Sequence, residues 1–259
     1  MELHIKNLKF AYNDKEILKN INLKFNTGYF YSIIGPNGSG KSTLLKNIAK
    51  IVSPAENSII IDNKDITKMN KKDLSKIISV IPQEINIDYD FTVYDIVLMG
   101  RNPYKKFFQD FNANDRVIAQ KYMKETNTWE LRDKLITELS GGEKQRVIAA
   151  RALTQEADII LLDEPTSHLD LQYQIEFLKI FRNLKKDKII IAVLHDLNLS
   201  SIFSDQIILI NSGKIIDKGI PAEVISTKNI KDVYNLSVEI NFNNNCPSII
   251  PIVTEGEVC

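Results

Sequence analysis

The sequence predicts an α/β fold, because short strands and helices alternate along the chain. An apolar run at 29–34 ends in a glycine-rich turn that is followed by good helix formers, which indicates a strand, a loop and a helix. Two further segments, 158–162 and 188–194, are apolar on both faces and flank a segment with helical periodicity. Because strands joined by a crossover helix run parallel, we expect a buried parallel sheet covered by helices.

The other elements follow from hydrophobic periodicity in chain order. Leu3, Ile5 and Leu8 alternate, and 17–25 repeats the pattern, so two strands open the chain. A helix is predicted over 41–51. Between 90 and 155 apolar residues recur at helical spacing with few strand-like runs, which indicates a helical insertion.

The last part of the chain returns to strands. One apolar stripe predicts the helix between the two buried strands, and its members are Leu171, Ile175, Leu178, Phe181 and Leu184. Strands at 206–210 and 214–217 flank a turn at 211–213, and we expect a polar tail from about Ser226.

Composition limits the function classes. The chain has 259 residues, of which 33 are basic and 33 acidic, so binding to nucleic acid through bulk charge is disfavoured. No apolar stretch approaches the roughly 20 residues that a bilayer span needs, and the first residues lack the apolar core of a secretion signal. The two cysteines, Cys246 and Cys259, lack metal-ligand spacing, so we expect a reducing, cytoplasmic setting.

A glycine-rich segment matches the phosphate-loop pattern GxxxxGK[ST], in which backbone amides close around phosphates at a helix N-terminus. It consists of Gly35, Pro36, Asn37, Gly38, Ser39, Gly40, Lys41 and Ser42, and Thr43 follows it. In that interpretation Lys41 contacts the β- and γ-phosphates, and the Ser42 hydroxyl ligates Mg²⁺. The alternative is a plain glycine turn between strand and helix. The strand before the loop and the helix after it favour the nucleotide interpretation.

A second candidate feature is the acidic pair that ends the strand at 159–162. Asp163 suits Mg²⁺, and Glu164 is placed one residue further on, where it can act as the general base for an attacking water. An acidic pair after a strand is also a common helix-entry cap. Together with the phosphate loop, however, it favours catalysis of phosphoryl transfer.

The segment 139–146, Leu-Ser-Gly-Gly-Glu-Lys-Gln-Arg, resembles the signature of the ATP-binding-cassette (ABC) family. Ser140, Gly141 and Gly142 precede a helix expected to start near Glu143, and such an amide-rich N-terminus suits a γ-phosphate, although a plain Ser N-cap is the alternative. In the family this motif acts on the nucleotide of the opposite subunit. The resemblance therefore implies a head-to-tail homodimer of ATPase subunits, with ATP and Mg²⁺ as cofactors.

The resemblance also implies roles for four other places. Tyr12 resembles the aromatic residue that stacks on adenine, and Gln83 the glutamine that touches Mg²⁺ and reports to the membrane partner. His195 resembles the switch histidine at the γ-phosphate. The segment 167–170 resembles the loop that communicates between the two sites, in which Asp170 is also a credible helix cap.

The fold that the resemblance implies is the P-loop NTPase type of an ABC nucleotide-binding domain, with an antiparallel β subdomain and an inserted helical subdomain. We expect this domain to span 1–225, with the helical subdomain at about 84–157 and a short extension at 226–259.

The segment 92–104 is similar to that of ATPases for iron-siderophore, haem and cobalamin uptake, as are 166–170 and the ending at 247–251. Without that resemblance, 91–104 reads as an amphipathic helix and its Gly-Pro stop. The resemblance implies integral membrane permease subunits, an extracytoplasmic substrate-binding protein, no nucleic acid, and a peripheral position on the cytoplasmic face of the membrane. The helical insertion, with the exposed end of 84–104, is the expected docking surface. The alternatives are an importer of another metal or metabolite, a regulatory ABC ATPase outside transport, and a nucleic-acid-associated cassette.

Overall fold

The computed structural model describes residues 1–259 except 84–86, 88, 107–108, 168, 244–245 and 253–259. Its centre is a six-stranded sheet in the order β10-β9-β3-β8-β7-β6. The five strands from β9 to β6 run parallel, and β10 pairs antiparallel with β9. The bounds are β3 (Phe30–Ile34), β6 (Ile78–Ile81), β7 (Ile159–Asp163), β8 (Ile189–Val193), β9 (Gln206–Asn211) and β10 (Lys214–Gly219). The predicted α/β class with a buried parallel sheet is confirmed.

Burial explains why the central strands show no alternation in the sequence. Every residue of β3, β7 and β8 is buried, because helices or a second sheet cover both faces of a parallel sheet. The polar Ser32 in β3 is accommodated by a hydrogen bond with the Ser204 hydroxyl at 2.5 Å. A buried hydroxyl that finds such a partner avoids the desolvation cost.

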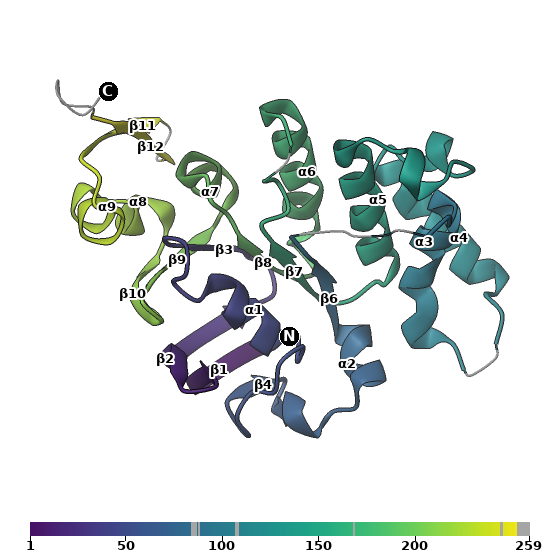
Figure 1. The fold of residues 1–259 in the computed structure, drawn as a ribbon, viewed down its shortest axis with the longest axis horizontal. Helices are drawn as coiled ribbons and strands as arrows, with labels where there is room; N and C mark the ends of the chain where they lie inside the picture. The colour runs from purple at the N-terminus through teal and green to yellow at the C-terminus, as the bar shows by residue number, and fades with distance from the viewer. Residues whose placement is uncertain (84–86, 88, 107–108, 168, 244–245, 253–259) are drawn as a thin grey trace.

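A four-stranded antiparallel sheet, in the order β2-β1-β4-β5, covers one face of the central sheet. It consists of β1 (Glu2–Tyr12), β2 (Lys15–Asn26), β4 (Ile59–Ile61) and β5 (Lys64–Asp65). The helix α1 (Lys41–Ile48) lies between the two sheets (Figure 1), and one hydrophobic cluster joins all three layers. Helix α1 is therefore held along its length, with the phosphate-loop segment at its start. It ends three residues earlier than predicted.

Helices cover the opposite face, and three of them gather beyond β6 (Figure 1). These three are α3 (Val93–Leu98), α4 (Ala113–Glu125) and α5 (Gly141–Thr154), with short 3-10 turns at Met99–Tyr104, Trp129–Leu131 and Ile136–Glu138. The fourth, α6 (Leu171–Leu184), buries Phe177, Leu178 and Phe181. Leu171 is 61% exposed, so the predicted stripe is wrong at its first member, since the start of α6 extends beyond the core.

The segment after α3 is anchored by a buried arginine. Arg101 Nε lies 3.0 Å from Asp115 Oδ1, and both side chains are almost fully buried. Arg101 Nη1 also donates to the Thr154 carbonyl at 3.0 Å and approaches Glu156 at 2.9 Å. A Cβ on Gly100 would lie 2.3 Å from the Arg151 carbonyl oxygen, so the chain passes too close to α5 for any side chain there. The segment therefore does more than end a helix, because it fixes α3 and α4 to α5.

The C-terminal region packs against β3 and β9 of the central sheet. Helices α7 (Leu197–Phe203), α8 (Pro221–Val224) and α9 (Thr227–Tyr234) and the hairpin β11 (Val238–Asn243) and β12 (Cys246–Pro251) share a third hydrophobic cluster. The expected polar tail is wrong for the described part of 227–251, which folds. Four of its apolar residues are buried in this cluster, namely Ile230, Val233, Val238 and Ile249.

Two elements complete the chain, the 3-10 turn Ile66–Lys68 and α2 (Lys71–Ile77). Among all the helices that the structure describes, none has the length and apolar character to cross a bilayer.

Candidate functional site

Four neighbouring strands end at one cavity. The glycine-rich loop follows β3, Gln83 follows β6, Glu164 follows β7 and His195 follows β8. Because β3, β8, β7 and β6 are adjacent and parallel, their carboxyl ends bring these segments together, as is usual for ligand sites in α/β proteins. The cavity measures about 460 Å³, and its lining comprises Lys15, Ile17, Asn37, Gly38, Ser39, Gly40, Lys41, Ser42, Thr43, Gln83, Glu164 and His195.

The glycine-rich loop curves around the Lys41 side chain. Gly38 and Gly40 have φ angles of 75° and 105°, which side chains rarely allow. Lys41 Nζ donates to the carbonyl oxygens of Gly35 at 2.8 Å and Pro36 at 3.0 Å. Burial lowers the pKa of Lys41, while the carboxylates of Glu164 and Asp163 act in the opposite direction. The loop thus encloses a cation at the start of α1, which is an arrangement suited to phosphate.

Ser42 and Asp163 meet at the floor of this region. The Ser42 hydroxyl donates to Asp163 Oδ1 at 2.8 Å. Burial raises the pKa of Asp163, the Ser42 hydrogen bond lowers it, and the charge of Glu164 raises it further. A hydroxyl and a carboxylate side by side are the oxygen donors that Mg²⁺ accepts. The two residues therefore fit the cation that accompanies a nucleoside triphosphate.

Glu164 is held at both carboxylate oxygens. Gln83 Nε2 donates to Oε2, and His195 Nε2 lies 2.6 Å from Oε1. The Glu164 side chain is only 11% exposed, and its backbone adopts φ 49°. A left-handed conformation at a residue other than glycine costs free energy and concentrates at functional sites. The geometry places a carboxylate where it can accept a proton from water in the cavity.

The signature segment, residues 139–146, does not line this cavity. Ser140 is the N-cap of α5, and its hydroxyl and backbone N–H hold the Glu143 carboxylate at 2.8 Å and 2.9 Å. These two hydrogen bonds lower the pKa of Glu143. Helix α5 begins at Gly141, two residues before the predicted start. Ser140, Gly141 and Gly142 are not among the residues that line the cavity, so one chain does not bring the signature to its own phosphate loop.

The expectations for Tyr12, Asp170 and the segment 167–170 have different outcomes. Tyr12 ends β1, is 44% exposed and packs edge-on against Phe10, but it does not line the cavity. Asp170 is the N-cap residue of α6, yet its side chain makes no capping hydrogen bond, so the predicted cap is wrong. In the segment 167–170, His168 lies outside the described residues.

Three contributors escaped the sequence analysis. Lys15 and Ile17 line the cavity, and Lys15 is the strand partner of Tyr12 across the β1–β2 turn, a signal that the hairpin pattern offered. Gln145 Nε2 donates to the Pro165 carbonyl at 2.8 Å and links α5 to the loop that follows Glu164. A glutamine inside a helix carries no sequence signal of such a contact.

Comparisons with known proteins agree with a nucleotide site in this cavity. A family described as ABC transporter matches residues 18–167. An uncharacterized ABC transporter ATP-binding protein of Methanocaldococcus jannaschii is 42% identical over 97% of this chain and 98% of its own length. The iron(3+)-hydroxamate import ATP-binding protein of Bacillus subtilis is 36% identical over 92% of this chain and 89% of its own. A cobalamin import ATP-binding protein of Halobacterium salinarum is 31% identical over 93% of this chain and 60% of its own.

Solved structures of ABC transporters and their cassettes superpose on this chain. A metal-chelate type ABC transporter in an inward-facing conformation superposes with a TM-score of 0.84 at 26% identity, covering 97% of both chains. A dimeric ATP-binding cassette in a post-hydrolysis state with ADP and Pi superposes with a TM-score of 0.73 at 29% identity, covering 85% of this chain and 98% of that one.

Proposed function

The chain belongs to the ABC transporter family and is an ATP-hydrolysing cassette, and from this premise we propose that it energises import of iron chelates, such as ferric siderophores and haem, or of cobalamin. The proposal is supported by relatives named for iron(3+)-hydroxamate and cobalamin import, each of which matches more than 90% of this chain. The structural observation that carries the hydrolytic part is the Glu164 carboxylate, held between Gln83 and His195 in the cavity that the phosphate loop lines.

We assign the reaction to residues of this cavity. The backbone amides of the loop from Gly35 to Thr43 and the Lys41 ammonium bind the β- and γ-phosphates of ATP. Glu164 accepts the proton of the attacking water, and His195 contacts the γ-phosphate and fixes the Glu164 carboxylate from the other side. Tyr12, at the end of β1, stacks on the adenine.

Ser42 and Asp163, with Gln83 nearby, would hold Mg²⁺. A cation held by these residues would neutralise charge that develops on the transferred phosphoryl group. The fit rests on the donor set, because a hydroxyl and a carboxylate oxygen lie 2.8 Å apart at the end of the loop.

A second copy completes the site. A Cβ at Gly141 would meet no atom within 4 Å, so packing inside this chain does not require glycine there. Glycine in a helix is nevertheless unfavourable by about 1 kcal/mol relative to alanine. We propose that Ser140, Gly141 and Gly142 bind the γ-phosphate of ATP on the partner copy, in a head-to-tail homodimer.

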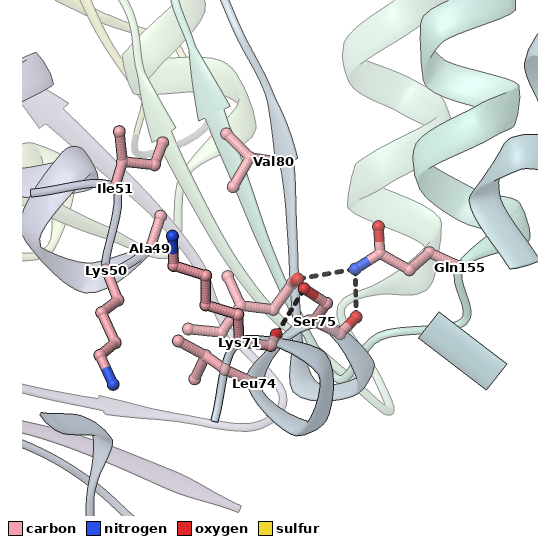
Figure 2. A pocket seen from close by; sticks show the side chains of 9 residues that line it. Ala49, Lys50, Ile51, Lys71, Leu74, Ser75, Val80 and Gln155 are labelled. Carbon is pink, nitrogen blue, oxygen red and sulfur yellow. Dashed lines mark hydrogen bonds between the residues drawn. The ribbon is translucent and has the colours of Figure 1, made fainter. Parts of the chain in front are cut away.

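The permease partner has a candidate groove of about 470 Å³ beside β6. Ile51 follows α1, Leu74 lies on α2 and Val80 on β6, and Gln155 closes the far side, where it donates to the Ser75 and Ile78 carbonyl oxygens (Figure 2). Ile51 is 63% exposed. A partly open groove with both apolar and polar lining residues suits a short amphipathic helix of a permease.

This groove is connected to both halves of the ATP site. Strand β6 leads from the groove to Gln83, and α5 leads from Gln155 back to Ser140. A permease segment seated in the groove therefore contacts two elements whose other ends reach nucleotide. Together with the exposed end of 84–104, part of which lies outside the described residues, this is the proposed docking surface.

The remaining parts of the proposal follow from importer architecture. The cassette sits peripherally on the cytoplasmic face of the membrane, and an extracytoplasmic protein delivers the cargo. Two other functions stay as alternatives, import of a different metal or metabolite and regulation by ATP outside transport. Neutral overall charge disfavours the nucleic-acid alternative.

Uptake of labelled cargo by cells distinguishes these functions. Cells whose only copy carries Glu164→Gln are given labelled ferric siderophore, haem and cobalamin in parallel, with Glu56→Gln at an exposed turn as the matched control. We expect selective loss of one cargo in the Glu164 variant alone. Uptake of all three at the wild-type rate, with other cassettes deleted, contradicts the import of these chelates.

Docking is tested separately. Ile51→Glu is expected to release the subunit from membranes that contain its permease, while hydrolysis by the purified subunit is kept. Ile216→Glu, at another exposed isoleucine on β10, is the control. Retention of the Ile51 variant on membranes contradicts the assignment of this groove.

A further inference from the structure

A groove of about 860 Å³ is lined by β1, β2 and β10 and shares no lining residue with the ATP cavity. Four of its eight lining residues are lysines, and we call it the lysine groove. The lysines are Lys9, Lys19, Lys214 and Lys218, and the one acidic lining residue is Glu16. Because basic and acidic residues are equal in number over the whole chain, such a local excess of positive charge needs a structural cause.

One cause is a bulge between β1 and β2. Lys9 alone faces two residues of β2, Lys19 and Asn20, and the regular pairs on either side are Leu8 with Ile21 and Phe10 with Leu18. Asn20 adopts φ 58°, a left-handed conformation that asparagine tolerates better than most residues. Bulges of this kind re-aim side chains. This one places the ammonium-bearing side chains of Lys9 and Lys19 on facing positions of two strands.

The other cause is a bulge in β10. The pairing of β10 with β9 skips Ile216, so the alternation shifts by one residue and Lys218 shares a side with Ile215. Asp217 falls on the opposite side, where its carboxylate accepts a hydrogen bond from Asn229 Nδ2 at 2.8 Å. The bulge therefore brings a lysine to the groove and turns an aspartate away from it.

The four lysines are not neutralised by the chain itself. In the part of the chain that the structure describes, no carboxylate forms an ion pair with any of them. Like charges on facing strand positions are unfavourable, so an anion between them relieves the repulsion. Lysine is a common phosphate ligand. The volume lies in the range of small-molecule sites, and a concave site suits a compact soluble molecule better than a flat membrane surface.

The lysine groove is connected to the phosphate loop through the turn between β9 and β10. Strand β10 lies beside β2 (Figure 1), and the Lys19 N–H donates to the Gly213 carbonyl oxygen at 2.8 Å. The Gly213 N–H in turn donates to the carbonyl oxygen of Ser39, a loop residue, at 3.0 Å. A change in the spacing of β2 and β10 therefore reaches the phosphate loop through one residue.

We propose that the lysine groove binds a soluble anion that carries several phosphate groups, and that this anion strengthens ATP binding at the phosphate loop. The anion neutralises lysines on both walls of the groove, draws β10 towards β2 and holds Gly213 against Ser39. Since coupling between two sites is reciprocal, ATP strengthens binding of the anion by the same factor.

Direct binding is tested by calorimetry with inositol hexakisphosphate as the probe, at constant ionic strength and constant free Mg²⁺. The full-length chain with Glu164→Gln is first saturated with ATP, so that the phosphate loop is filled. Adding Lys9→Gln and Lys214→Gln, one lysine from each wall, is expected to weaken probe binding at least about tenfold, because each lost contact with phosphate is charge-assisted.

A charge-matched control separates the groove from net charge. Lys179→Gln with Lys186→Gln removes two exposed lysines, one on α6 and one just after it. This control is expected to bind the probe as tightly as the parent chain. Equal probe binding by the control and the groove variant would overturn the proposed site.

Coupling is measured as the ATP Kd with and without the probe, in chains that keep Glu164. The probe is expected to lower the ATP Kd at least about fivefold in the wild type and in the control, and to leave it unchanged in the groove variant. Without the probe, all three proteins are expected to bind ATP equally. A probe that raises the ATP Kd equally in all three competes at the phosphate loop, which contradicts the coupling.

Two other outcomes overturn the ligand assignment. Binding of the chain to vesicles that contain phosphatidylglycerol, without binding of the soluble probe, would assign the groove to lipid headgroups. Strands β2 and β10 lie at sheet edges, where lysines also prevent pairing with other molecules. Aggregation of the groove variant with unchanged probe binding would leave the lysines with that role alone.

The coupling rests on ATP binding at the phosphate loop, whereas the anion site does not. A wild-type chain that binds the probe but no ATP would refute the assignment of the ATP site and keep the lysine groove. A wild-type chain that binds and hydrolyses ATP but does not bind the probe would refute the lysine groove alone.

Discussion

The Nε2 atom of His195 lies 2.6 Å from Oε1 of Glu164. The two residues follow adjacent parallel strands, β8 and β7, and their contact exists only because the sheet aligns the strand ends. Gln83, from the next strand, donates to the other Glu164 oxygen. The carboxylate is therefore oriented by its neighbours on both sides of the sheet, and this orientation underlies the predictions on catalysis.

Glu164→Gln is expected to keep ATP binding and to lower hydrolysis about 10²- to 10⁴-fold, the usual contribution of a general base. Glutamine preserves the shape and the contact with Gln83 but cannot take a proton from water. Release of phosphate at steady state and equilibrium binding of ATP measure the two effects. Turnover at the rate of the Glu56→Gln control would refute the assignment.

Ser42→Ala is expected to raise the Mg²⁺ concentration for half-maximal hydrolysis about tenfold or more, since it removes one of two adjacent oxygen donors. Titration of hydrolysis with Mg²⁺ measures the shift, and chelation of the cation should stop wild-type turnover. The exposed Ser53→Ala serves as the control. An unchanged Mg²⁺ dependence in the Ser42 variant would remove this residue from the metal site.

Gly141→Ala separates folding from function. The added methyl group meets no atom within 4 Å, so stability is expected to stay unchanged or to rise by up to about 1 kcal/mol. Hydrolysis is nevertheless expected to fall, because the methyl group projects where the partner copy must bring its nucleotide. Gly213→Ala gives the contrast, since its Cβ would lie 2.1 Å from the Ile17 carbonyl oxygen, and folding itself should suffer. Full activity in the Gly141 variant contradicts the shared site.

Arg101→Ala is expected to destabilise the fold by about 3–5 kcal/mol, because it leaves the buried Asp115 carboxylate without its partner. Denaturant unfolding measures this loss. Arg132→Ala is the matched control, since Arg132 pairs with Asp133 at the surface and its removal should cost about 1 kcal/mol or less. Equal losses in the two variants would show that burial of the Arg101 pair is unimportant.

Stability at high pH is expected to depend on Tyr122. Burial raises the pKa of Tyr122 to about 12 from its usual 10.0. Because the folded state binds this proton more tightly than the unfolded state, the contribution is complete below pH 10 and is lost as pH rises towards 12. The stability of wild type relative to Tyr122→Phe should therefore fall between about pH 10 and about pH 12 in denaturant titrations. A constant difference over that range would contradict the shift.

Short sequence patterns were enough to predict much of the fold. The strand, glycine-rich loop and helix at 30–48 follow each other directly, so their relation is written in consecutive residues. The buried strands β7 and β8 were recognisable because continuous apolar runs indicate burial on both faces. The interpretation failed at the C-terminal segment. Ile230, Val233, Val238 and Ile249 join the core there, but polar residues separate them along the chain, so no continuous apolar run marks the segment as folded.

Helix capping also shows where prediction from local sequence stops. Ser140 caps α5 as its sequence context indicates, because Glu143 three residues later completes the box. Asp170 stands at the equivalent position of α6 without a capping bond, since a residue type favours a cap but the surrounding loop decides where the side chain points.

The sequence by itself determined which chemical groups are present and in what order they follow their strands, since the phosphate loop, the acidic pair and the signature are each contiguous. Only the tertiary structure decided which groups meet. Gln83, Glu164 and His195 come from three separate segments and converge because parallel strands end at one edge. The contact of Asn198 with Ile249 likewise joins residues far apart in the chain. Such pairings depend on the summed packing of the whole core, which no local pattern contains.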